Sequence, residues 1–331
     1  MNRAHIVGIA RFMPEQIIYN TVSDDHGEFF KAPKERRFAS PKYSSADLGV
    51  LALQNLLKQT NFKAEDLDLI LVSCSIQDFV NISVGPDIQY RSGATRAQVL
   101  NIDTGCAAYV SMLNVADAFI KAGVHKNIAI VTITNFISRL ADFQKSPRSQ
   151  VLGDGASATL IIPGEASILA SVEESHGENY PLWKCRPHGP SGEPQNYWET
   201  NTGPLEVEFD VEQIEKIKKN SIELIVSAVN KSIQKAELTK DQIDFLITHQ
   251  PNRGLVQKWR DGIEIDVPRA FDTFEQFGNL FQSSIPVTLS VLMESGRLKS
   301  GNKLALGTFS NAGDFAAGMV LNFPGEGRMP A

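Results

Sequence analysis

The chain has 331 residues, of which 42% are hydrophobic and 21% charged, a composition typical of a globular protein with a substantial core. Its net charge of -6 does not suggest a nucleic-acid partner, no apolar run approaches the ~18 residues of a membrane span, and the start lacks the apolar stretch of a signal peptide. The three cysteines, Cys74, Cys106 and Cys185, are scattered, predict neither disulfides nor a metal site, and suit a reducing cytoplasm.

Helix and strand signals alternate through the first half of the chain. The segment 45–60 has the apolar spacing of a helix, with Ser44 or Ser45 as its N-cap. The elements that follow are predicted from apolar runs bounded by turn residues. They are a strand at 68–75, a buried strand at 99–103, a helix at 107–122 ended by Gly123, and strands at 128–134 and 153–162.

The second half shows a similar order of elements, which suggests an internal duplication. The predicted elements are a helix at 211–235, a strand at 243–249, a helix at 286–295, and strands at 302–309 and 316–323. Because buried apolar strands alternate with helices, we expect mostly parallel sheets covered on both faces. The segment 173–204 is rich in Gly, Pro, Asn and Trp, so we expect a long surface excursion there.

Cys106 lies where the strand at 99–103 turns into the helix at 107–122. A thiol at a helix N-terminus feels the positive end of the helix dipole, which favours the thiolate. The backbone N–H groups of such a turn can also receive a developing oxyanion. The local sequence therefore predicts an acyl-transfer nucleophile, and fits a small buried core residue equally well.

Two polar residues of the second half could assist Cys106. His249 ends a strand in the run THQPN, and open α/β sheets present their sites at that edge. Asn279 follows Gly278 just before a helix, where an Asn commonly forms a turn or cap. The combination of Cys, His and Asn favours catalysis over these separate structural interpretations. The run GDGAS (153–157) lacks the Lys-Ser/Thr of a nucleotide loop and predicts a tight turn near the floor of the site.

The motifs around these residues resemble the β-ketoacyl-acyl-carrier-protein synthase III family of thiolase-fold condensing enzymes, and the resemblance covers nearly the whole chain. The matching segments are IDTGCAAYVSML around Cys106, GDGASATLI, ITHQPN around His249, FGNLFQSSIPVTL around Asn279, and the run ESGRLKSGNKLAL. The spacing between His249 and Asn279 also agrees with the family pattern.

The resemblance implies an α/β protein with the thiolase fold, in which duplicated α/β/α halves form a five-layered α-β-α-β-α architecture. The first half would comprise residues 1–165 and carry Cys106, and the second would comprise residues 166–331 and carry His249 and Asn279. The family further implies a homodimer that uses coenzyme A or acyl-carrier-protein thioesters as substrates and needs no other cofactor.

The resemblance also implies the chemistry. Cys106 would be acylated by an acyl thioester, with the oxyanion held by the backbone of Cys106 and of the loop residues Asn311 and Ala312. His249 and Asn279, as neutral donors, would then hold the enolate left by decarboxylation of a malonyl- or β-ketoacyl-type thioester. The product would be a β-ketoacyl thioester or a related diketide of specialised or fatty-acid-like biosynthesis.

Several segments depart from the family pattern. The run FFKAPKERRF (29–38) lacks the family's Trp and Thr-Gly-Ile, so only Arg36 or Arg37 remains as a contact for coenzyme A phosphates. Asn81 lies near the position of the family's aromatic acyl-pocket gate. These departures favour a carrier-protein-bound donor or an unusual acyl group. An acidic carrier protein needs a basic landing site, for which we expect Arg253 and Lys258.

Two alternatives stay open. The same fold could serve a non-elongating acyltransferase that passes the acyl group from Cys106 to form a C–O, C–N or C–C bond. The chain could also be a silent partner subunit of an active paralogue, although the intact Cys106, His249 and Asn279 set argues against that role.

Overall fold

The computed structural model describes residues 2–20, 31–139, 149–180, 182–196, 205–209 and 211–325. Its largest sheet has five strands in the order β1-β7-β6-β4-β5. Strand β4 pairs in parallel with β5 and β6, whereas β7 runs antiparallel to β6 and β1. The bounds are β1 Arg3–Phe12, β4 Leu69–Cys74, β5 Gln98–Asn101, β6 Ile128–Thr134 and β7 Gly155–Gly164.

A second sheet has four strands in the order β11-β12-β13-β8. Only β11 and β12 pair in parallel, because β13 runs antiparallel to both of its neighbours. The expectation of mostly parallel sheets is therefore wrong. The short turn 311–314 joins β12 directly to β13, and such a turn can only return the chain antiparallel. The bounds are β8 Ile168–Ser175, β11 Phe245–Thr248, β12 Lys303–Ser310 and β13 Phe315–Asn322.

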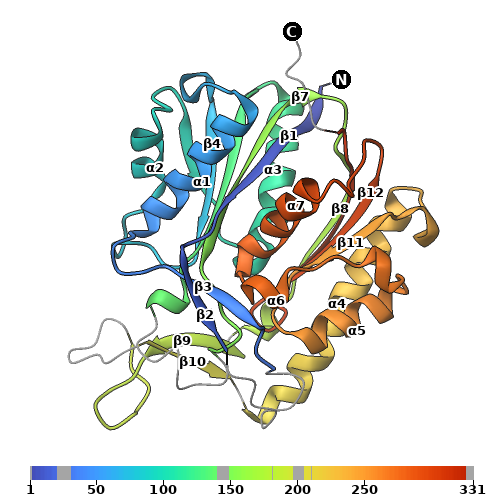
Figure 1. Ribbon diagram of the computed structural model, residues 1–331. Helices are drawn as coiled ribbons and strands as arrows, with labels where there is room; N and C mark the ends of the chain where they lie inside the picture. Colours follow the sequence, from blue (N-terminus) through green and yellow to red (C-terminus); the bar gives the residue numbers. More distant parts are fainter. Residues whose placement is uncertain are drawn as a thin grey trace.

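Helices and sheets alternate in five layers, as Figure 1 shows, which confirms the architecture expected from the resemblance. Two helices cover the outer face of the five-stranded sheet, two cover that of the four-stranded sheet, and two lie between the sheets and contact both. In that order they are α1 Ser45–Thr60 and α2 Gly85–Ser92, α4 Ile214–Lys235 and α5 Arg253–Ile263, and α3 Ala108–Ala122 and α7 Ser284–Glu294. A further short helix, α6, spans Phe274–Phe277.

The helix boundaries follow from capping. The side chain of Ser44 accepts from the Asp47 N–H and the Asp47 carboxylate accepts from the Ser44 N–H, so a capping box starts α1 as expected. Gly123, in a left-handed conformation, ends α3. Strand β7 of the five-stranded sheet ends at Gly164, and β8 of the four-stranded sheet begins at Ile168, so the division into halves at 165/166 stays a prediction. The internal duplication stays a prediction.

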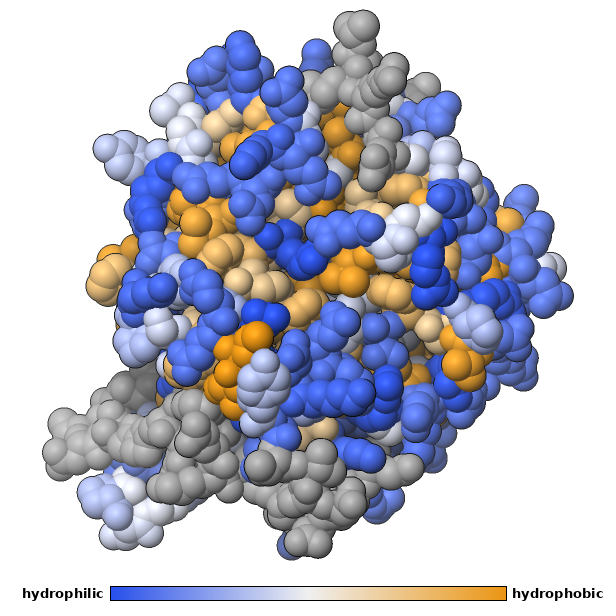
Figure 2. All heavy atoms as spheres, viewed as in Figure 1, coloured by the Kyte–Doolittle hydropathy of each residue, from blue (hydrophilic) through white to orange (hydrophobic). Residues whose placement is uncertain are grey.

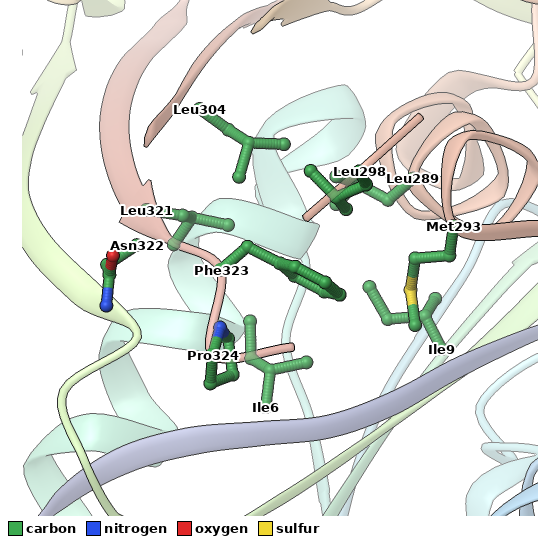
Figure 3. A pocket seen from close by; sticks show the side chains of 10 residues that line it. All are labelled: Ile6, Ile9, Leu289, Met293, Leu298, Leu304, Leu321, Asn322, Phe323 and Pro324. Atoms are coloured by element: carbon green, nitrogen blue, oxygen red, sulfur yellow. The ribbon is translucent and has the colours of Figure 1, made fainter. Parts of the chain in front are cut away.

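The two halves share one apolar interior. The largest core cluster joins side chains of β1, β4 and β6 to side chains of β11, β12 and β13 through α3 and α7. Arg11 of β1 crosses this junction and donates to the Glu294 carboxylate of α7 at 2.8 Å. Figure 3 shows where Ile6, Met293 and Phe323 converge around a crevice, with Asn322 at its margin. Its volume of about 10 Å³ leaves room for little more than one water, so the crevice is a packing gap.

Two small antiparallel sheets lie at the lower end of the molecule in Figure 1. One pairs β2 (Gln16–Tyr19) with β3 (Glu35–Phe38), and the other pairs β9 (Trp183–Pro187) with β10 (Leu205–Phe209). In the second of these sheets, β9 lies within the expected excursion at 173–204, and β10 lies just beyond it. No helix in the part of the chain that the structure describes is both long and apolar enough to cross a membrane.

Strand β5 differs from its prediction. The sequence predicts a buried strand, yet most of its residues are exposed, and Leu100 is 41% exposed. The reason is position, because β5 is an edge strand with only β4 as its neighbour. The edge of β5 and its apolar side chains are therefore accessible for contact with another chain.

Candidate active site

Cys106 occupies a short turn between β5 and α3. This 3₁₀ turn, η4, spans Gly105–Ala107 and leads directly into the helix. Gly105 has φ +55°, and a Cβ placed there would come within 2.9 Å of the Ser310 Cβ, so both conformation and space require glycine. The Asp103 carboxylate accepts from the Gly105 N–H at 3.0 Å and fixes the entry to the turn.

Strand β12 of the other half clamps this turn. The Thr308 hydroxyl donates to the Cys106 carbonyl at 3.0 Å, and the Ser310 hydroxyl donates to the Thr104 carbonyl at 2.6 Å. Both hydroxyl side chains are fully buried. The nucleophile turn is therefore held by hydrogen bonds that cross between the halves.

The ionisation of Cys106 contradicts the sequence-based expectation of a stabilised thiolate. Burial, with smaller contributions from the nearby Asp314 and Asp103 carboxylates, raises the pKa of the Cys106 thiol to about 12. The backbone N–H groups of Asn311 and of Cys106 itself oppose this rise, since they donate toward the sulfur. The desolvation of the buried sulfur outweighs the effect of the helix N-terminus, so the resting group is a neutral thiol.

His249 follows β11 directly and is buried. Its backbone N–H donates to the Gly307 carbonyl at 2.8 Å, continuing the ladder between β11 and β12. Burial lowers the pKa of the imidazole to about 3, and an interaction with the Phe281 backbone only partly opposes this. The ring lies edge-to-face on Phe309 and is neutral, and its Nδ1 atom has no hydrogen-bond partner among the described residues.

Asn279 is fixed by the GDGAS turn. The Asn279 N–H donates to the Val151 carbonyl at 2.7 Å, and the Gly153 N–H donates to the Asn279 carbonyl at 3.0 Å. A Cβ on Gly153 would come within 2.1 Å of the Phe277 carbonyl oxygen, so this glycine permits the contact. The turn therefore packs against the site as predicted. Because the Asn279 Oδ1 accepts from the Phe281 N–H at 2.9 Å, the Nδ2 amide remains as the donor.

Phe281 links the three candidate residues. Its N–H holds Asn279, its backbone contacts the His249 ring, and it begins η10 (Phe281–Ser283), which packs against the Cys106 turn. Cys106, His249 and Asn279 thus meet at the junction of the two halves.

Aromatic side chains support this junction from one side. The Phe281 ring stacks on Phe136 with centroids 4.9 Å apart, and Trp183 of β9 lies 6.3 Å from Phe281. None of these three residues was predicted from the sequence to lie at the site. For Trp183, the only indication in the sequence was a tryptophan within the predicted excursion at 173–204.

Arg36 is a structural residue, so its predicted contact with coenzyme A is wrong. The side chain is 1% exposed, and it donates to the Asn20 Oδ1 and to the Ser149 and Leu152 carbonyls. Burial lowers the pKa of Arg36 to about 10, and the Asp154 charge opposes that change. Asp154 is itself fully buried, with its pKa raised to about 7 by desolvation.

Replacing Arg36 with Met should lower the free energy of unfolding by about 3 kcal/mol or more, because it leaves the buried Ser149 and Leu152 carbonyls without their charged donor. Arg37 provides the matched control, since its side chain is 22% exposed and its ion pair with Glu35 is long, at 3.8 Å. Arg37→Met should cost less than about 1 kcal/mol. Equilibrium denaturation in urea measures both, and equal losses would contradict the structural role of Arg36.

The other predicted binding residues lie on the surface. Asn81 is exposed in a turn with φ +66°, outside the buried site. Arg253 is paired within the chain, at 2.9 Å to Asp272 and 3.6 Å to Glu275, and its role as a carrier contact stays a prediction. Lys258 is exposed on α5.

Of the predicted oxyanion loop, Ala312 is fully buried and directly follows Asn311. Among the described residues, no group of three His, Cys, Asp or Glu side chains is arranged to hold a metal ion.

Comparisons with known proteins agree with this geometry. A family model described as 3-oxoacyl-[acyl-carrier-protein] synthase III matches residues 100–177, and the model of its C-terminal part matches residues 233–323. The β-ketoacyl-[acyl-carrier-protein] synthase III of Clostridium acetobutylicum is 27% identical over 314 residues, covering 92% of this chain and 94% of that protein. The enzyme of the same name from Clostridioides difficile is 26% identical and covers 96% of this chain and 98% of its own.

Solved structures extend the comparison. A 3-oxoacyl-(acyl-carrier-protein) synthase III superposes with a TM-score of 0.84 at 25% identity, covering 97% of this chain and 100% of that one. The priming β-ketosynthase of the R1128 polyketide biosynthetic pathway superposes with a TM-score of 0.86 at 20% identity, covering 98% and 97%. The second likeness concerns the fold alone.

Proposed function

This chain belongs to the β-ketoacyl-[acyl-carrier-protein] synthase III family and is a condensing acyltransferase, and from that premise we propose that Cys106, His249 and Asn279 carry out its reaction. The observation that carries the proposal is the meeting of these three residues around Phe281 at the junction of the halves. The division into halves at 1–165 and 166–331 belongs to the same proposal, because each half supplies part of the site.

In the first step the Cys106 sulfur attacks the carbonyl carbon of an acyl thioester. The bond to the carrier sulfur breaks, the carrier leaves as a thiol with the proton from Cys106, and the acyl group remains on Cys106. The Asn311 and Cys106 N–H groups, which donate toward the sulfur, would receive the oxyanion. Because the resting thiol is neutral, it is stable in the buried site until a thioester binds. Its proton then passes to the sulfur of the departing carrier.

In the second step a malonyl-type thioester loses CO₂. The electron pair of the breaking C–C bond becomes an enolate, whose oxygen is held by the Asn279 amide and the neutral His249 ring. The enolate carbon attacks the acyl carbonyl, the bond to Cys106 breaks, and the cysteine thiolate takes up a proton. The low pKa of His249 keeps its ring uncharged throughout the neutral range.

The substrates of this proposal are thioesters of coenzyme A or an acyl carrier protein, with no further cofactor. Because Arg36 is buried, Arg37 is the residue that we propose as the contact for the phosphates of coenzyme A. Arg253 and Lys258 of α5 are the proposed carrier contacts, and Arg253 also pairs with Asp272 and Glu275 within the chain. The cysteines are three in number and scattered along the chain, which favours a reducing compartment, the cytoplasm.

The proposed homodimer has a suitable surface beside β5. Phe79, Val80, Ile82 and Tyr90 are exposed in the segment between β4 and β5, and Leu100 is exposed on β5 itself. An apolar group next to an unpaired sheet edge favours pairing with a second copy of the chain. Figure 2 shows that the face seen there also carries apolar residues near its centre, between hydrophilic margins.

Replacing Leu100 with Lys should shift the protein from dimer to monomer, because it places two charges across the paired edges. Light scattering after size-exclusion chromatography measures the molar mass. Val267→Lys is the matched control, since Val267 is an exposed apolar residue (64%) on the second half. A Leu100→Lys variant that keeps the dimer mass would contradict this interface.

The proposed function is tested by mixing the protein with acyl-CoA or acyl-carrier donors and a malonyl thioester, and by detecting CO₂ and a β-ketoacyl product. Production of both supports condensation. Acyl transfer to an alcohol or amine without CO₂ would favour the non-elongating acyltransferase. No reaction with any donor, together with an unreactive Cys106, would favour the silent subunit.

A further inference from the structure

The turn between β12 and β13 contains a residue in a strained conformation. Asn311 has φ +45°, in the left-handed region that glycine adopts at no steric cost. The turn is closed by the Gly313 N–H, which donates to the Ser310 carbonyl at 2.7 Å. Its conformation matters for chemistry because the Asn311 N–H, together with that of Cys106, donates toward the Cys106 sulfur.

Asp314 stabilises this conformation. The Asn311 side-chain amide donates to the Asp314 carboxylate at 2.8 Å, which closes the turn a second time through side chains. Asp314 is anchored in turn, because its carboxylate accepts from the Phe315 N–H at 3.1 Å and its carbonyl accepts from the His176 N–H at 2.7 Å. Asp314 is only 8% exposed, so the carboxylate has few ways to move.

The charge of Asp314 cannot serve to activate the nucleophile. A carboxylate near a thiol opposes thiolate formation, and Asp314 indeed raises the pKa of Cys106. Because the Asp314 carboxylate disfavours ionisation of Cys106, any contribution that it makes to the reaction must come from a different interaction. Its hydrogen bond to the strained residue supplies that other role.

We propose that Asp314 is a positioning residue for the oxyanion site, holding the Asn311 backbone N–H toward the thioester carbonyl through the Asn311 side chain. The inference rests on the proposed function of Cys106 and deepens it. Rotation of Asn311 to an ordinary negative φ would turn its N–H away from the reacting carbonyl, and the stabilisation of the oxyanion would be lost.

The test measures single-turnover acylation of Cys106 by intact mass in a double-mutant cycle. Asp314→Ala should lower the maximal acylation rate about tenfold without changing the donor concentration at half-maximal rate. Asp314→Asn keeps an acceptor oxygen and should stay within about threefold of wild type. In an Asn311→Gly background, Asp314→Ala should cost less than about twofold, because glycine adopts the left-handed conformation unaided.

Alkylation of Cys106 by iodoacetamide provides a second readout, because it needs no oxyanion site. Asp314→Ala should alkylate as fast as wild type or faster, since a charge that opposes the thiolate is gone. An equal tenfold loss in the glycine background, or slowed alkylation, would overturn the positioning role. If wild-type protein alkylates but accepts no donor, the proposed function fails, and the failure is recognisable as such.

Discussion

Asn279→Ala should lower the rate of decarboxylative condensation by about 10²- to 10³-fold and leave acylation of Cys106 nearly unchanged. The reason is that Cys106 acts in the acylation step, whereas Asn279 acts only in the later decarboxylation step. The Asn279 amide is free to donate because Phe281 holds its oxygen, and the enolate forms only after the acyl group is in place. The measurement is CO₂ release from a malonyl thioester, set against intact-mass detection of the acyl-enzyme.

His249→Ala should show the same pattern, and the double variant should lose less than the product of the two single losses, because both residues hold one oxygen. The burial that lowers the pKa of His249 to about 3 also means that CO₂ release by the wild-type protein should show no titration of this ring between pH 5 and 8. An Asn279→Ala variant with full CO₂ release would contradict the role of Asn279, whereas full acyl transfer by this variant without CO₂ release would favour the non-elongating acyltransferase.

Cys106→Ala should abolish the acyl-enzyme and reduce condensation by more than about 10³-fold, because no other residue can hold the acyl group. The Ala variant should still release CO₂ from a malonyl thioester, since His249 and Asn279 remain in place. Mass spectrometry of the protein and of the products measures the two activities separately.

Cys74→Ala is the matched control for Cys106→Ala. Cys74 is also a free cysteine whose pKa is raised to about 12 by burial, but it lies at the end of β4, with its sulfur donating to the Ile76 carbonyl at 3.2 Å. This variant should keep the acyl-enzyme. Persistence of a donor adduct in Cys106→Ala would contradict the assignment of the nucleophile.

Local sequence patterns predicted the elements well because their signals are local. Strand β6 and helix α1 have the predicted bounds, and Gly123 ends α3 as expected. The direction of the strands was less predictable, because pairing depends on connections far apart in the chain. The exposure of β5 likewise depends on its edge position, which apolar residues alone do not reveal.

The candidate catalytic residues could be proposed from motifs, whereas their electrostatics could not. A helix N-terminus suggested a thiolate at Cys106, but the cost of burying the sulfur is set by residues of both halves. Arg36 was predicted to be a surface residue because its sequence neighbours are charged. Only the fold brings the Ser149 and Leu152 carbonyls next to its side chain. The same limit applies to Phe281 and Trp183, whose positions arise from tertiary packing.

The most direct test of the central claim is a single-turnover chase of the isolated acyl-enzyme. The protein is acylated, freed of excess donor, and mixed with a malonyl thioester while its intact mass and CO₂ are followed together. We expect the adduct on Cys106 to disappear at the rate of product formation, with one CO₂ released for each acyl group lost. An adduct that persists while CO₂ is released, or one that is lost without CO₂, would contradict it.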